Sequence, residues 1–505
     1  MIFKKVFCLF LSVMMIISAF SAVAVSANAE NGVSVAAFGG GQPPEKPDGE
    51  MPGEPPEGMG GPGGGMGTPP DGAPGEGMGT PPDGTPGGKG GPGGMPGGGS
   101  GSSDIDYSGA LEITSADSQD GLTYETSTVD QSALLISAAE DVTVTNPTVV
   151  KSGSSDGGDS CNFYGLNAAV LVKDGSTTTI TGGTITSDAD GANGVFSYGG
   201  NGGRNGAEGD GTTVIIRDTV ITTTGSGSGG IMTTGGGTTY AYDLTVTTSG
   251  GSSAPIRTDR GGGTVHVDGG SYTSNGLGSP AIYSTADITV ENAVLTSNLS
   301  EGVCIEGKNS ITLLNCDLSA SNTKCNGNAT FLDTIMIYQS MSGDADSGTS
   351  SFTMTGGSLT SKNGHVFHVT NTNAVINLSD VEIRNKDVSG VLLSVCDDGW
   401  SGAGNVAALN ADGQELSGTI LVGSNSSLTL NLTNGSTFTG TVGGEIVNAK
   451  GNTVSTEVGT VDVTLDSTST WSLTGDTYVS SFSGDTANIS FNGYTLYVDG
   501  VAVNP

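Results

Sequence analysis

The chain has 505 residues, of which 51 are acidic and 16 basic, so its formal net charge at neutral pH is −35. Such a surface repels nucleic acid and anionic lipid, and it favours solubility and the binding of divalent cations. The composition therefore excludes a nucleic-acid-binding protein, and we expect no nucleic-acid partner.

Residues 1–29 predict a secretory signal peptide. Lys4 and Lys5 precede a long apolar run that ends at Ala27-Asn28-Ala29, which is typical of a leader cleaved after Ala29. The run is about 20 residues long, so it could also remain as an uncleaved N-terminal membrane anchor. Both interpretations predict a secreted or cell-surface protein with no other attachment to a membrane.

Residues 30–103 are predicted to be a disordered linker. From residue 39 onwards nearly all residues are Gly, Pro, Met, Glu, Asp or Thr, and GMGTPPDGAPGE is followed directly by GMGTPPDGTPGG. A segment of this composition cannot bury a core. We therefore expect a flexible tether before a folded domain that spans residues 104–505.

The folded domain is predicted from a repeat of short alternating strands. The segments GGIMTT, SAPIRT, SPAIYS and GVCIEG place apolar anchors at Ile231, Ile256, Ile282 and Ile305, spaced 25, 26 and 23 residues apart. A second alternating strand follows each anchor, and in two successive repeats these second strands align without a gap, at a spacing of 23 residues. Asn292 and Asn315 align at the turns, which favours stacked polar ladders.

A period of this length, built from short strands and turns, predicts an all-β fold, a right-handed parallel β-helix solenoid of roughly a dozen coils. The last coils and a cap would occupy about residues 415–505. A β-sandwich of irregular strands is the alternative, and the gapless alignment argues against it.

The coil pattern resembles right-handed parallel β-helix proteins of the pectin-lyase-like kind. The phrases GTILVGSNSSLTLNLTNGSTFTGTV and STSTWSLTGDTYVSSFSGD resemble passenger regions of adhesin-like and autotransporter proteins. The resemblance covers most of residues 105–500 and implies an architecture rather than an activity, because the fold hosts lyases, hydrolases, adhesins and stalks. The chain departs from the arginine motif of pectate lyases and from the later motifs of polygalacturonase-like hydrolases, so no catalytic residue is assigned.

A loop rich in arginine predicts the first candidate site. Two of the chain's five arginines, Arg257 and Arg260, precede the triplet Gly261–Gly263. If Ile256 points into the core, Arg257 points outward and aligns with residues of the neighbouring coils, namely Met232, Tyr283 and Glu306. This predicts a shallow, mixed-charge groove for an acidic glycan. Its candidate ligand-binding residues are Arg257, Asp259, Arg260, Tyr283, Glu306 and Lys308. Alternatively, the same side chains form ladder salt bridges, each worth at most about 1 kcal/mol.

The loop CDDGWSGAG is a second candidate patch. Its two acids and its indole could form a sugar subsite or an acid pair, and a solvated turn is the alternative. The candidate residues are Asp397, Asp398 and Trp400. His365 and His368 are three apart in a strand, so we expect them on opposite faces and expect no shared zinc site.

No cofactor is required by the sequence, and calcium is the metal that its acidic turns favour. One set of carboxylates lies in the turns SDADG and GDADSG, and a second set recurs at one position of successive coils. The candidate calcium ligands are Asp188 and Asp190, Asp344 and Asp346, and the column Asp243, Asp268 and Glu291. Five cysteines follow the leader, and this odd number favours buried free thiols over a disulfide framework.

These patterns predict an exported β-helix protein that binds a polysaccharide or a host or cell-surface glycan, or that mediates adhesion. A polysaccharide lyase or glycoside hydrolase acting on acidic glycans is one alternative. A purely structural surface stalk is the other.

Overall fold

The computed structural model describes residues 105–202 and 208–503. The predicted leader, the whole of the predicted linker and the last two residues lie outside this part of the chain. No helix among the described residues is long and apolar enough to cross a membrane.

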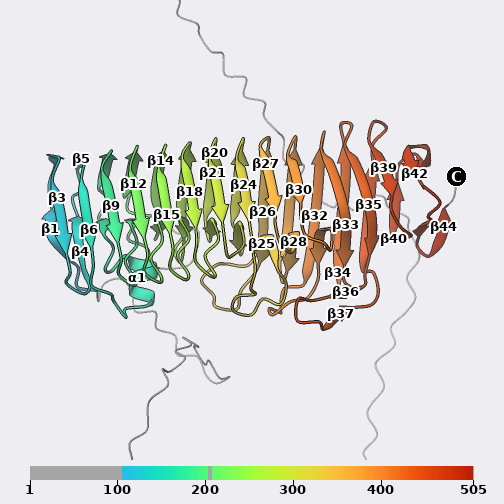
Figure 1. Ribbon diagram of the computed structural model, residues 1–505, viewed down its shortest axis with the longest axis horizontal. Helices are drawn as coiled ribbons and strands as arrows, with labels where there is room; N and C mark the ends of the chain where they lie inside the picture. The colour runs from blue at the N-terminus through green and yellow to red at the C-terminus, as the bar shows by residue number, and fades with distance from the viewer. Residues whose placement is uncertain (1–104, 203–207, 504–505) are drawn as a thin grey trace, which may run out of the picture. The chain divides into compact units, whose positions relative to one another are not determined.

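Three long sheets of parallel strands dominate the structure (Figure 1), which confirms the predicted parallel β-helix. Sheet A has 15 strands: β1 (Ser108–Ile113), β4 (Gln131–Ile136), β7 (Val170–Val172), β10 (Val195–Tyr198), β13 (Ile231–Thr234), β16 (Ile256–Thr258), β19 (Ile282–Ser284), β22 (Val303–Glu306), β25 (Asp333–Tyr338), β28 (His365–Thr370), β31 (Val391–Val395), β33 (Glu415–Val422), β35 (Thr437–Gly443), β39 (Thr470–Leu473) and β42 (Ile489–Ser490).

Sheet B has 14 strands: β2 (Asp117–Asp120), β5 (Asp141–Thr145), β8 (Thr177–Thr181), β11 (Thr213–Arg217), β14 (Gly237–Tyr242), β17 (Gly263–Asp268), β20 (Asp287–Glu291), β23 (Ser310–Leu314), β26 (Thr349–Thr355), β29 (Asn373–Ser379), β32 (Asn405–Asp412), β34 (Ser426–Thr433), β38 (Thr460–Leu465) and β41 (Ser481–Ser483).

Sheet C has 10 strands and ends earlier along the chain: β3 (Thr123–Thr126), β6 (Thr148–Lys151), β9 (Thr184–Ser187), β12 (Val220–Thr223), β15 (Thr245–Thr248), β18 (Ser271–Ser274), β21 (Val294–Ser297), β24 (Asp317–Ala320), β27 (Ser358–Ser361) and β30 (Glu382–Asn385). Each coil up to β30 therefore contributes one strand to each sheet, and later coils contribute strands to A and B only.

The remaining elements are small. Strands β36 (Ile446–Val447) and β37 (Thr453–Ser455) form a hairpin, and β40 (Thr477–Val479), β43 (Leu496–Val498) and β44 (Val501–Val503) form a three-stranded sheet. The helices described are α1 (Asp159–Tyr164) and a short 3-10 helix, Thr486–Asn488.

Columns of apolar side chains from the stacked strands fill the interior between the sheets. In β20 the inward residues are Ile288 and Val290, and they pair directly with Ile311 and Leu313 of β23, as the gapless alignment predicts. Alternation in a strand sends every second side chain inward, so these columns stack at about 4.8 Å per coil into one continuous core.

The turn between sheets B and C explains the aligned asparagines. Asn292 and Asn315 both adopt the left-handed backbone conformation, with φ of 54° and 51°, and Asp218 and Asp243 do the same at the equivalent turns of earlier coils. Asn and Asp tolerate this conformation better than other side chains except glycine. The column therefore reflects a backbone requirement repeated in each coil.

All five described cysteines are free thiols, and four of them are buried. They are Cys161, Cys304, Cys316, Cys325 and Cys396, of which Cys325 is the more exposed one.

Candidate functional site

Arg257 lies on the outward side of β16, in the predicted register. It pairs with Met232 of β13 and with Tyr283 of β19. Its guanidinium is largely buried and donates to Asp259 Oδ2 at 2.8 Å and to the carbonyl of Ser252 at 3.0 Å. Burial raises the pKa of Asp259 to about 6, although Arg257 opposes that rise. The two side chains form a buried ion pair, so Arg257 has little free charge to offer a ligand.

Glu306 does not align with Tyr283 as predicted. Val303, not Ile305, pairs with Ile282, so Cys304 stands opposite Tyr283 and Glu306 lies two residues further along β22. Both Val303 and Ile305 point into the core, and strand alternation alone cannot decide which of them is the equivalent of Ile282.

The side chain of Glu306 still reaches the same region. It is 2% exposed, and it accepts hydrogen bonds from the hydroxyls of Tyr283 at 2.5 Å, Tyr338 at 3.0 Å and Ser340. Burial, and then the charge of Glu306, raises the pKa of each tyrosine well above its ordinary value. The carboxylate is thus held by hydroxyl groups, and it fixes the two tyrosine rings in place.

Arg260 and Lys308 contact the residues that we expected to hold calcium in the turn GDADSG. Arg260 donates to Asp344 Oδ1 through Nε at 3.0 Å and Nη2 at 2.5 Å, and Lys308 Nζ lies 3.0 Å from Asp346 Oδ2. Phe163 of α1 supports Arg260 from below, with the guanidinium 4.3 Å from the ring centroid. The two carboxylates therefore neutralise two bases instead of sharing a cation.

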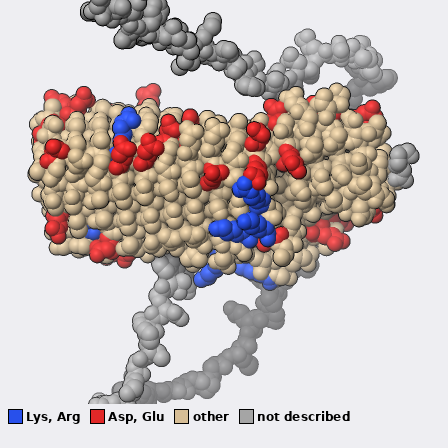
Figure 2. Space-filling view, turned by 45° about the horizontal axis from the view of Figure 1, so that its top comes forward, with Lys and Arg blue, Asp and Glu red and all other residues tan. Residues whose placement is uncertain are grey.

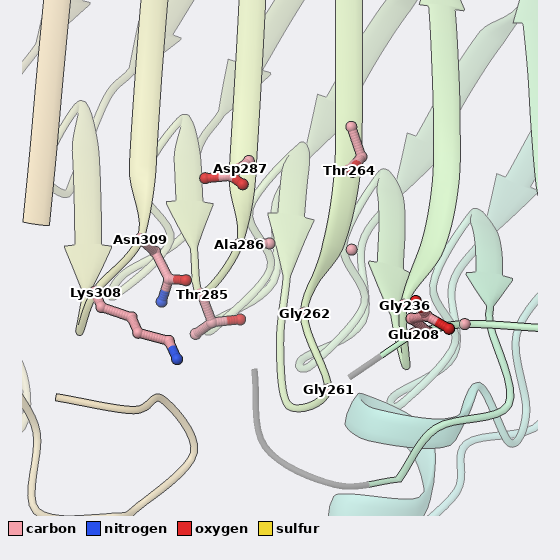
Figure 3. Close-up of a pocket in the computed structure, with 12 residues that line it drawn as sticks. Glu208, Gly236, Gly261, Gly262, Thr264, Thr285, Ala286, Asp287, Lys308 and Asn309 are labelled. Carbon is pink, nitrogen blue, oxygen red and sulfur yellow. The ribbon is translucent and has the colours of Figure 1, made fainter. Parts of the chain in front are cut away.

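The glycine triplet serves packing between coils. Gly261 has φ of 89°, and a Cβ at this position would lie 2.5 Å from the carbonyl oxygen of Asn201. The triplet also lines an open cavity of about 340 Å³ (Figure 3). Lys308 lies at one end of this cavity and Glu208 at the other, with glycine backbone between them. Its lining also includes the side chains of Thr264, Thr285, Asp287 and Asn309 but no aromatic ring.

A second pair of adjoining cavities, which we call the aromatic groove, brings together residues from both predicted patches. The cavities measure about 250 and 300 Å³. Both are lined by Pro280, Tyr283, Asn326 and Tyr338, while Arg257 lines the first and Trp400 the second. Trp400 is half-buried and packs on Tyr338, with ring centroids 4.9 Å apart. Three aromatic rings from different coils and loops thus meet in one groove.

Asp397 and Asp398 do not join Trp400 in the groove. Asp397 is exposed and accepts a hydrogen bond from Asn405 Nδ2 at 2.7 Å. The carboxylate of Asp398 is fully buried, lies 3.3 Å from His368 Nε2, and accepts hydrogen bonds from the backbone N–H and the hydroxyl of Thr330. Burial raises its pKa, but His368 and Thr330 outweigh that effect and hold it below the ordinary value. Asp398 therefore fastens the loop 321–332 to the solenoid.

The two histidines of β28 lie on the same face, contrary to the sequence prediction. His365 Nδ1 and His368 Nδ1 lie 2.7 and 2.8 Å from the same hydroxyl, Ser394 Oγ. Because Val366 and Phe367 both enter the core, the strict alternation of β28 breaks between them. The resulting Ser394–His368–Asp398 chain resembles a catalytic triad in its contacts, but His368 and Ser394 are 0% exposed and cannot reach a substrate.

Sequence reasoning missed two carboxyl groups beside the groove. Glu301 lines the larger cavity, and its Oε1 accepts a hydrogen bond from Asn322 Nδ2 at 3.1 Å. Asp333 occupies the equivalent position of the next coil, because Val303 pairs with Ile335 and the N–H of Gly302 donates to the carbonyl of Thr334. Burial, together with the charges of Glu301 and Asp398, raises the pKa of Asp333 well above its ordinary value. The sequence holds a signal that could have found them, because each acid lies two residues before one of the paired core residues, Val303 and Ile335.

The other predicted calcium ligands lie apart or have protein partners. Asp188 and Asp190 are exposed, and Asp190 Oδ1 accepts a hydrogen bond from the N–H of Ser226 at 2.7 Å. Asp268 aligns with Glu291, as predicted, but with Tyr242 rather than Asp243, which occupies the left-handed turn position. Among the described residues, no three His, Cys, Asp or Glu side chains form a group that could hold a metal ion.

Comparison of the chain with protein-family models, with curated proteins and with solved structures found no match.

Proposed function

We propose that the protein binds a polysaccharide in the aromatic groove. The observation that carries this proposal is the meeting of Tyr283, Tyr338 and Trp400 around adjoining cavities of about 250 and 300 Å³. Aromatic rings with a polar edge offer a sugar an apolar face and a hydrogen-bonding group together. The predicted leader and linker support a protein that acts outside the cell, as a secreted or surface-attached β-helix of the pectin-lyase-like, adhesin-like kind.

The groove itself favours sugars without a charge. Arg257, its basic residue, is engaged by Asp259 at 2.8 Å, and Glu301 adds a carboxylate to the wall. The carboxylate of a uronic acid in the groove would be repelled by Glu301, and Arg257 is already paired. A neutral sugar does not experience this repulsion. Recognition in the groove thus relies on ring stacking and hydrogen bonds.

The test is a binding measurement on immobilised polysaccharides with the full chain, its Trp400→Ala variant and its Tyr478→Ala variant. Tyr478 is an exposed aromatic residue of β40, far along the chain from the groove, and it serves as the matched control. Loss of binding in Trp400→Ala alone supports the proposal. Equal binding by all three proteins contradicts it.

A second candidate function is glycoside hydrolysis, for which Glu301 is the carboxyl group that lines the groove, whereas Asp333 is 1% exposed and does not line it. A carboxyl group that stays protonated can act as a general acid, and a neighbouring carboxylate can act as a base or nucleophile. The residues that we first considered for this chemistry are less suitable, because Lys308 is ion-paired and Glu306 is held by several hydroxyls. Release of reducing ends from a bound polysaccharide, lost in Glu301→Gln and Asp333→Asn, would demonstrate hydrolysis. Unsaturated products absorbing in the ultraviolet would instead demonstrate a lyase.

A further inference from the structure

Basic side chains are scarce in this chain, and on the face shown in Figure 2 most of them lie in one central region beside a few acids, with another basic group apart from them. Four lysines of the described residues are exposed and have no carboxylate within 4.0 Å: Lys324, Lys362, Lys386 and Lys450. We call them the basic corner. Their position in the fold brings them close together.

Two of these lysines stack on adjacent coils. Ser361 of β27 pairs with Asn385 of β30, and the next residues along both strands are Lys362 and Lys386. The N–H of Lys386 donates to the carbonyl of Ser361 at 2.8 Å, so the backbones run side by side at this point. Strands in a sheet lie about 4.8 Å apart, so the two lysines leave neighbouring backbones, and neither has a carboxylate of the described residues within 4.0 Å.

The other two lysines approach the same corner from loops. The N–H of Lys362 donates to the carbonyl of Ala320, the last residue of β24, and Lys324 follows four residues later. Lys450 belongs to the hairpin loop between β36 and β37, where the N–H of Ala449 donates to the carbonyl of Thr330 at 2.9 Å. The charge of Lys450 also acts on Cys325, the neighbour of Lys324.

Nearby acids offset only part of this charge. Both carboxylate oxygens of Asp387 accept hydrogen bonds from backbone, from Gly364 and from Ser389, and neither lies within 4.0 Å of a lysine. Glu382 is paired with Arg384. In a chain with a net charge of −35, the unpaired lysines therefore form a local positive surface where most of the molecule repels anions.

The loop 321–332 connects the basic corner to the aromatic groove. Lys324 belongs to the corner, while Asn326 and Ala329 of the same loop line the groove. A polysaccharide chain that leaves the groove across this loop thus meets the lysines next. A linear polymer fits this path better than a membrane does, because the corner continues a groove rather than a flat surface.

We propose that the basic corner binds the anionic groups of a carboxylated or sulfated polysaccharide whose uncharged stretch occupies the aromatic groove. This proposal rests on the proposed function and extends it, because the groove holds the sugar rings and the corner selects for charge. The ligand that we propose is still an acidic polysaccharide, as the sequence predicts, but these lysines bind its anionic groups in place of Arg257 and Arg260.

The test measures binding of the full chain to partially methyl-esterified pectin and partially sulfated dextran, which combine charged and uncharged stretches, and to neutral galactan and vesicles of anionic phospholipid. The variant is Lys362→Gln/Lys386→Gln, and the control is Lys173→Gln, which removes a lysine that already pairs with Asp174. We expect each of these lysines to contribute about a fivefold gain in affinity for an anionic polymer, the gain that a lysine gives near an anionic lipid surface. We expect the double variant to lose about 25-fold in affinity for the acidic polymers and nothing for galactan, and we expect wild-type binding to weaken as salt screens the charges.

Equal binding of partially methyl-esterified pectin and partially sulfated dextran by wild type and double variant would overturn the inference, and so would tight binding to vesicles alone. These outcomes are separable from failure of the proposed function. If Trp400→Ala leaves galactan binding intact, the groove proposal fails, whatever the lysine variant does.

Discussion

Replacement of Arg257 by alanine should destabilise the fold by several kilocalories per mole. The change removes three donated hydrogen bonds, to Asp259 Oδ2 at 2.8 Å, to the carbonyl of Ser252 at 3.0 Å and to Asn162 Oδ1 at 3.3 Å. Asp259 is 5% exposed and keeps one protein donor, the N–H of Arg260 at 3.0 Å. Removing one partner of a buried ion pair costs about 3–5 kcal/mol, whereas an exposed pair contributes at most about 1 kcal/mol.

The sign of the pH dependence follows from Asp259. Its pKa of about 6 in the folded protein exceeds the unfolded value of about 3.9. The folded state therefore takes up a proton that the unfolded state does not, and stability is gained as pH falls through 6 and lost as pH rises. Arg257 opposes this rise, so the variant should have a still higher pKa at Asp259. Its destabilisation should be larger at pH 8 than at pH 5.

The assay is urea denaturation of wild type, Arg257→Ala, Asp259→Ala and the double variant at both pH values. We expect the double variant to recover at least half of the stability lost by Arg257→Ala at pH 8, because no charge is left buried. A loss below about 1 kcal/mol at pH 8, or a loss equal at the two pH values, would refute the buried pair and favour a solvated salt bridge.

Three further predictions concern the core, the loop anchor and metal. Trp471 is buried, its ring centroid lies 5.6 Å from that of Phe438, and its Nε1 donates to the carbonyl of Gly440 at 3.2 Å. Trp471→Ala should therefore lower the free energy of unfolding, measured by urea denaturation, by about 3–5 kcal/mol. A change of under about 1 kcal/mol would contradict this packing. Asp398 has a lowered pKa in the folded state, so its contribution to stability is present above the unfolded pKa of about 3.9 and is lost as pH falls through the folded value. The stability difference between wild type and Asp398→Asn should thus shrink below about pH 4, and a difference that stays unchanged below that pH would be inconsistent with the hydrogen bonds that stabilise the carboxylate. A calcium chelator should leave the Tm unchanged, because Asp344 and Asp346 are paired with Arg260 and Lys308; a fall in Tm restored by calcium would show that an ion is bound elsewhere.

The repeat of the fold was predictable because equivalent positions of successive coils have the same environment and therefore need the same kinds of residue. Ile288 with Ile311 and Val290 with Leu313 mark the core columns, and residues such as Asn292 and Asn315 mark a left-handed turn. The position of Glu306 was wrong by two residues, since Val303 and Ile305 are equally suited to the core.

The site was only partly predictable, because loops rather than strands complete it. The alignment of the repeats correctly predicted that Arg257 pairs with Tyr283 on the neighbouring strand. The pairing of Arg260 with Asp344 joins residues 84 positions apart through a loop without regular structure, and no periodicity encodes its path. The same holds for Trp400, which reaches Tyr338 from a loop that folds back on the solenoid. Strand patterns place side chains on a face, and loop packing decides which of them meet.

The measurement that tests the central claim most directly is a glycan array, with neutral and acidic polysaccharides, probed with wild type, Trp400→Ala and Tyr478→Ala. We predict that wild type and Tyr478→Ala bind the same polysaccharides and that Trp400→Ala loses at least tenfold in affinity for them, because Trp400 supplies a ring of the groove. Binding that survives in Trp400→Ala, or an array on which wild type binds no glycan, would contradict the account and leave the solenoid as a stalk.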